Sequence, residues 1–198
     1  EPTTTSVLGY SATRSEGKLI VHRVPIFCAC ERGGVEFGEA WVSTAVRHAM
    51  RQQAEGYLPP LHIRHHEPST DITNAVQAVG FFRILGAEPI TLKGKRRNAI
   101  LADLIFTDAN AMEAVLSMRL PYRSVEIHNV DEPSIDSLAL LDHEAPFLEL
   151  PLLKVSDIAD EDGAAVAGAT FGAAWSMDAT ATGSPVVACF RRGTAASL

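Results

Sequence analysis

Residues 120–127 read Leu-Pro-Tyr-Arg-Ser-Val-Glu-Ile, and this stretch predicts a strand that follows a helix. Pro121 cannot continue a helix, while the aromatic and β-branched side chains after it suit a pleated surface. Because side chains alternate along a strand, Ser124 and Glu126 share one face and Arg123 lies on the other. The stretch therefore places a hydroxyl beside a carboxylate. The alternative is an ordinary strand serine flanked by a solvated pair of Arg123 and Glu126.

A histidine-rich segment, residues 57–68, offers a base for that hydroxyl. It holds three histidines and a carboxylate between prolines, which is unusual for a surface loop. Alternation along this segment places His65 on the same face as Leu61, and His62 and His66 on the other. A serine needs a base to become a nucleophile, and the base usually comes from a distant part of the chain. We expect His65 to be the inward imidazole, with His66 as the fallback.

The order of the segments resembles that of the phage prohead proteases. The resemblance rests on a Leu-x-x-x-His segment closing a strand, a strand started by Gly80, an Ala-Asp-Leu-Ile-Phe strand, a helix and an Arg-Ser-x-Glu-Ile strand. It covers roughly residues 19–153 in motif order, and within the family the chain is most similar to the phage Mu I-protein group. This family shares its fold with herpesvirus assemblin. The resemblance thus implies an α+β fold, a small closed β-barrel surrounded by helices.

That resemblance also implies an activity, a set of partners and a location. The chain would be a serine endopeptidase of phage head maturation that cleaves scaffold and capsid proteins, and itself, during procapsid assembly. Ser124 would be the nucleophile and His65 the base, with no cofactor and no metal. Capsid and scaffolding proteins would be its partners, with self-association as a further option. The expected location is the host cytoplasm, inside the procapsid, or the virion.

The third catalytic residue of the family falls in the next predicted strand, residues 133–146, where this chain departs from the family pattern. Many prohead proteases carry a Glu about seven residues before a Pro-Ala pair, and here Ser137 or a neighbour occupies that point. Asp136 is the nearest carboxylate, so we take it as the third residue. Glu126 and His143 compete with it.

Two other functions fit the sequence. The first is a non-catalytic or spent protease-fold protein that stays in the capsid as a minor structural component, which the unclear third residue and the Ala/Gly/Ser-rich tail favour. The second is a zinc hydrolase that uses His62, His65 and His66. No further ligand with suitable spacing is evident, and the Cys-Ala-Cys at residues 28–30 lacks the two-residue gap of a zinc knuckle.

Composition limits the class of protein. The chain has 198 residues, of which 46% are hydrophobic, enough for a real core. A net charge of −7 argues against specific nucleic-acid binding, and the basic run at residues 93–97 is better explained as the turn of a hairpin. No apolar run reaches membrane-spanning length, so no membrane partner is expected. The three cysteines are an odd number, which favours reduced thiols.

We expect three parts along the chain: a flexible N-terminal arm (1–15), a barrel domain (16–155) and a poorly structured C-terminal arm (156–198). Apolar spacing predicts amphipathic helices near residues 38–54, ended by Gly56, and near residues 109–118, capped by Thr107-Asp108. The small residues of the C-terminal arm bury little area to offset their ordering entropy. The first residue is Glu1 and not Met, which suggests a self-trimmed product.

Overall fold

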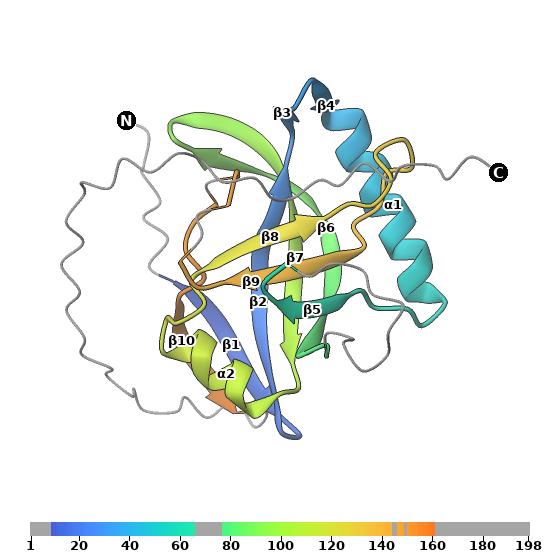
Figure 1. The fold of residues 1–198 in the computed structure, drawn as a ribbon. Helices are drawn as coiled ribbons and strands as arrows, with labels where there is room; N and C mark the ends of the chain where they lie inside the picture. The colour runs from blue at the N-terminus through green and yellow to red at the C-terminus, as the bar shows by residue number, and fades with distance from the viewer. Residues whose placement is uncertain (1–8, 66–76, 144–145, 149, 161–198) are drawn as a thin grey trace.

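The computed structural model describes residues 9–65, 77–143, 146–148 and 150–160 (Figure 1). The first half contains β1 (Tyr10–Ser15), β2 (Lys18–Cys28), β3 (Cys30–Arg32), β4 (Val35–Phe37), α1 (Glu39–Ala54) and β5 (Pro60–Ile63). The second half contains β6 (Gly80–Leu92), β7 (Lys95–Phe106), α2 (Ala109–Leu116), β8 (Tyr122–Glu126), β9 (Ser137–Leu141) and β10 (Val155–Asp160). Strands thus dominate the described chain.

Eight of the strands form one mixed sheet in the order β10-β1-β2-β7-β6-β5-β9-β8, and β3 and β4 form a separate hairpin. The pairs β1–β10 and β5–β9 are parallel, and the others are antiparallel. The sheet is open, since in the described part of the chain the outermost strands, β10 and β8, do not pair with each other. The prediction of a closed barrel, which the resemblance to the prohead proteases implied, is therefore wrong.

Strands β2 and β8 approach each other without pairing. Strand β2 carries Pro25, which has no N–H to donate to a neighbouring ladder. The register of β2 against β7 also shifts on both sides of this region, between Val21 and Val24 and between Pro25 and Phe27. The approach of β8 to β2 is made by a side chain, because Arg123 Nε donates to the Pro25 carbonyl at 2.8 Å. A guanidinium bridge, and not a strand ladder, therefore links β8 to β2.

The ordered sheet extends beyond the predicted barrel segment at both ends. β1 lies inside the segment predicted to be a loose arm, and it pairs with both β2 and β10. β10 crosses the predicted boundary at residue 155 and runs to Asp160. Residues 161–198, which hold most of the predicted C-terminal arm, lie outside the described residues, as do residues 1–8.

The two predicted helices are confirmed, and both pack against central strands of the sheet, α1 against β6 and β7 and α2 against β7 (Figure 1). α1 buries one stripe of small and β-branched residues, namely Val42, Ala45, Val46 and Ala49. Its Gln53 side chain accepts from Ile84 N at 2.6 Å and donates to Ile84 O at 3.0 Å, next to the bulge in β6. These two bonds satisfy the backbone N–H and C=O of Ile84 and tie the last turn of α1 to β6.

Local signals explain where both helices end or begin. Gly56 follows α1 with a φ of +90°, a conformation that costs glycine little, so the predicted end of the helix is confirmed. Asp108 caps α2, and its carboxylate accepts from Ala111 N at 2.8 Å, as the sequence predicts. Across the described residues, neither helix has the length and apolar character needed to cross a bilayer.

Candidate functional site

Strand register brings Ser124 and His62 into one row. Ala139 of β9 is paired with Ser124 of β8 on one side and with His62 of β5 on the other. Residues paired across neighbouring strands project from the same face of a sheet. All three are buried, with exposed fractions of 4% for Ser124, 0% for Ala139 and 7% for His62. The candidate nucleophile thus shares its face with a buried imidazole, and the residue between them is small.

Glu126 lies two residues from Ser124 on the same face of β8, and it binds a second histidine. His65 Nδ1 is 2.9 Å from Glu126 Oε1, with side-chain exposed fractions of 21% and 15%. The hydroxyl of Ser137, the residue paired with Glu126 on β9, donates to the other carboxylate oxygen. A carboxylate at Nδ1 fixes the ring and assigns the base function to Nε2. The predicted base and one of its three proposed partners therefore lie together.

Arg64 explains how His65 reaches that carboxylate. Its backbone is left-handed, with a φ of +65°, and β5 ends one residue earlier, at Ile63. The alternation of a strand no longer holds after this point, so the predicted division of the histidines by parity is wrong for His65. Two bonds hold the bend: Arg64 N donates to Leu140 O at 2.8 Å, and Arg64 Nη2 donates to Asp142 Oδ2 at 2.8 Å. The hydrogen bond from Arg64 lowers the pKa of Asp142 to about 2.

Asp136, the predicted third residue, makes its contacts elsewhere. Its Oδ2 accepts from His128 N at 2.7 Å and lies 3.0 Å from His128 Nδ1, and Ser134 Oγ donates to its Oδ1 at 3.1 Å. His143, another competitor, lies 2.7 Å from the neighbouring Asp142. Of the three candidates, Glu126 is the one with a hydrogen bond to His65 in the structure.

The zinc alternative can be assessed for part of its ligand set. His66 lies outside the described residues. Among the residues that the structure does describe, no group of three His, Cys, Asp or Glu side chains is arranged to hold a metal ion. The contacts of His65 are those of a histidine oriented by a carboxylate.

Arg123 is a fully buried cation next to Ser124. Nε donates to Pro25 O at 2.8 Å, Nη1 to Pro151 O at 2.7 Å and Nη2 to the Tyr10 hydroxyl at 3.5 Å. Burial lowers the pKa of Arg123 and raises the pKa of Tyr10. The alternative interpretation of Arg123 and Glu126 as a solvated pair is therefore wrong. The guanidinium of Arg123 instead ties β8 to the N-terminal strands and to the segment after β9.

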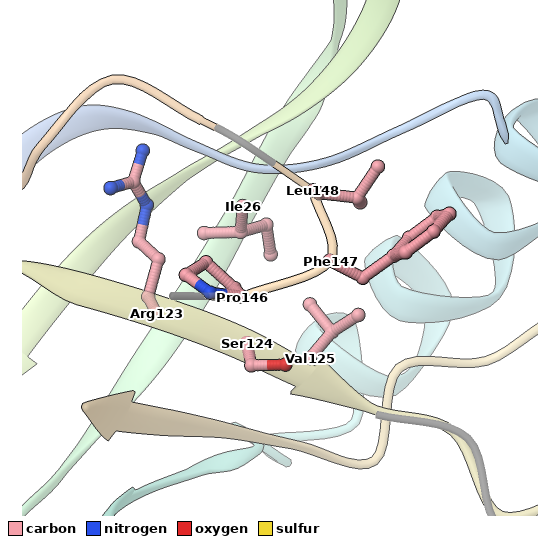
Figure 2. Close-up of a pocket in the computed structure, with 7 residues that line it drawn as sticks. All are labelled: Ile26, Arg123, Ser124, Val125, Pro146, Phe147 and Leu148. Atoms are coloured by element: carbon pink, nitrogen blue, oxygen red, sulfur yellow. The ribbon is translucent and has the colours of Figure 1, made fainter. Parts of the chain in front are cut away.

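A short segment, residues 146–148, encloses the space beside Ser124. Figure 2 shows its three side chains next to the strand that carries Arg123, Ser124 and Val125. The cavity there has a volume of about 10 Å³ and is lined by Ile26, Arg123, Ser124, Val125, Pro146, Phe147 and Leu148. Such a volume is close to the minimum for one water molecule. The cavity is therefore too small to hold a peptide.

Sequence reasoning did not single out His62 as a neighbour of Ser124, nor Ser137 as a partner of Glu126. The alternation in each strand was visible, but the register that aligns β5, β9 and β8 was not. Comparison of the chain with protein-family models, with curated proteins and with solved structures found no match. A function for the chain is therefore inferred from the geometry of this site and from the resemblance of its motifs to those of the phage prohead proteases.

Proposed function

We propose that the chain is a serine endopeptidase in which Ser124 is the nucleophile, His65 the base and Glu126 the residue that orients the base. The observation that carries this proposal is the 2.9 Å contact between His65 Nδ1 and Glu126 Oε1, on the face of β8 that also carries Ser124. Burial of the carboxylate strengthens this contact, since the local dielectric is lower than that of water.

The proposed reaction gives Ser124, His65 and Glu126 one role each. His65 Nε2 takes the proton from Ser124 Oγ as the oxygen attacks a peptide carbonyl, and Glu126 stabilises the imidazolium that forms. The imidazolium then returns the proton to the leaving amine, and an ester to Ser124 remains. Water, deprotonated by the same imidazole, hydrolyses the ester and regenerates the hydroxyl. Ser137 is a positioning residue, because its hydrogen bond holds the carboxylate that holds the base.

The order of the sequence motifs supports a more specific proposal, a prohead protease of head maturation. Its substrates and partners would be scaffold and capsid proteins, including the chain itself, with self-association as a further property. It would act in the host cytoplasm, inside the procapsid, and could stay in the virion. This part of the proposal rests on the Arg-Ser-x-Glu-Ile segment and the upstream histidine segment.

The enclosed position of Ser124 favours a second candidate, a non-catalytic component of the capsid. Ser124 is only 4% exposed, and its cavity has room for about one water molecule. An active enzyme must expose Ser124 to its substrate, whereas a structural protein can keep this residue enclosed.

Labelling with a fluorophosphonate probe distinguishes the two candidates, because the probe reacts with a serine only when a base activates it. We expect the probe to attach to Ser124 in the wild type, as located by mass spectrometry, and not to His65→Ala. Ser134→Ala is the matched control, since this serine binds Asp136 and not the His65–Glu126 pair. His62→Ala tests the buried imidazole that lies in one row with Ser124 and Ala139. Absence of labelling together with absence of casein cleavage would reject the protease and favour the structural candidate.

A further inference from the structure

A second, larger hollow adjoins the cavity beside Ser124. It has a volume of about 450 Å³, and Phe147 and Leu148 line both spaces. Its walls also include three basic side chains, Lys93, Lys95 and Arg97, and one acidic side chain, Glu31. We call this hollow the basic groove. The cavity and the basic groove therefore both lie against residues 146–148.

The β6–β7 hairpin sets the positions of the basic side chains. Lys93 and Gly94 both have positive φ, at 48° and 74°, as in the tight turns that match the twist of a hairpin. Beyond the turn, Lys95 and Arg97 are separated by two positions in β7 and so share a face, while Arg96 points to the other. Arg97 Nη1 donates to Ala29 O at 3.0 Å, which fixes the base of the hairpin to the end of β2.

The charge of the groove is opposite to that of the whole chain. Among the residues that the structure describes, three cations and one carboxylate line it, whereas the chain carries a net charge of −7. Its walls also offer apolar contact through Phe147, and the guanidinium of Arg32 lies 4.7 Å from the centre of that ring. Cations beside an apolar wall suit a polypeptide that carries carboxylates among apolar side chains.

We propose that the basic groove binds an acidic segment of the polypeptide substrate while the adjoining bond lies at Ser124. This inference rests on the proposed endopeptidase function and adds a substrate class to it. A single-stranded nucleic acid would also be attracted by cations, but its binding relies on aromatic stacking platforms along a longer basic track. Phe147 is the one aromatic side chain among the described residues of its lining.

The chain contains a matched pair of variants for the test. Lys95→Glu reverses one charge inside the groove, and Arg96→Glu makes the same change on the neighbouring exposed residue of the opposite face. Binding is measured in a Ser124→Ala background by fluorescence anisotropy, with a short labelled peptide in which Glu alternates with Ala. Its counterpart has Gln in place of Glu, and labelled oligo-dT serves as the nucleic-acid probe.

We expect the Glu peptide to bind more tightly than the Gln peptide, and more weakly as salt is added. Lys95→Glu should weaken binding of the Glu peptide by about tenfold, while Arg96→Glu should change it by less than about twofold. Equal affinity for the two peptides, equal effects of the two variants, or tighter binding of oligo-dT than of the Glu peptide would each overturn the proposal.

The binding measurement needs no catalysis, so the two proposals fail separately. Loss of fluorophosphonate labelling at Ser124 with Lys95-dependent peptide binding would reject the protease and leave the groove as a peptide-binding site. Labelling at Ser124 without such binding would reject the groove and leave the protease.

Discussion

His65 and Glu126 are 61 residues apart in the chain, yet Nδ1 of the first lies 2.9 Å from Oε1 of the second. The contact depends on two features that are themselves distant in sequence: the left-handed turn at Arg64 and the position of β8 at the outer edge of the sheet. It joins the candidate base to the strand that carries the candidate nucleophile. The first two predictions follow from it.

Ser124→Ala and His65→Ala should each abolish peptide cleavage, and the double variant should be little worse than either single one. Residues that act as one unit lose activity non-additively, by roughly six orders of magnitude in a well-studied serine protease. The rate of casein or peptide hydrolysis checks this, with circular dichroism to show that each variant is folded. Equal activity of His65→Ala and the wild type would exclude His65 as the base and direct attention to His62.

Glu126→Gln should lower kcat by up to roughly 10⁴-fold, because an amide keeps the shape of the carboxylate but can hold the wrong tautomer of His65. The matched variant is Asp136→Asn, which alters the contact with His128 and should leave kcat within about twofold. Ser137→Ala should fall between them, since it removes one hydrogen bond to Glu126. A large loss in Asp136→Asn with little change in Glu126→Gln would restore Asp136 as the third residue.

Arg123→Met should destabilise the fold by about 3 kcal/mol or more, because it leaves the buried Pro25 carbonyl, the partly buried Pro151 carbonyl and the Tyr10 hydroxyl without the donor they have now. Urea unfolding followed by circular dichroism measures the loss. Arg119→Ala is the control, as this exposed arginine pairs with Glu113 on the surface and should change the free energy of unfolding by less than about 1 kcal/mol. Similar losses in the two variants would show that Arg123 does not hold the edge of the sheet.

Iodoacetamide should modify Cys30 before Cys28. Cys28 is 1% exposed, and burial raises the pKa of its thiol, so the reactive thiolate is scarcer and less accessible at a given pH. Cys30 is partly exposed. Labelling of Cys28 should rise only at higher pH or after addition of urea. Mass spectrometry of the labelled peptides follows both sites, and equal rates at neutral pH would contradict the buried position of Cys28.

Much of the local structure could be predicted from the sequence. The apolar spacing of residues 38–54 predicted α1, Asp108 predicted the start of α2, and Pro121 with the residues after it predicted β8. Each of these signals acts within a few residues, through backbone geometry, a capping bond or the alternation of side chains. Such effects are encoded in the neighbouring residues themselves.

The sequence by itself also determined which residue types the site contains: a serine and a glutamate on one strand face, and histidines in one upstream segment. Only the tertiary structure decided that Glu126 meets His65, that His62 shares a row with Ser124, that Arg123 is buried and that the sheet stays open. These relationships depend on strand register, on the left-handed backbone of Arg64 and on the hydrogen bond from Arg123 to the Pro25 carbonyl. Long-range pairing sets them, and a pattern read along one strand carries no information about its neighbour's register.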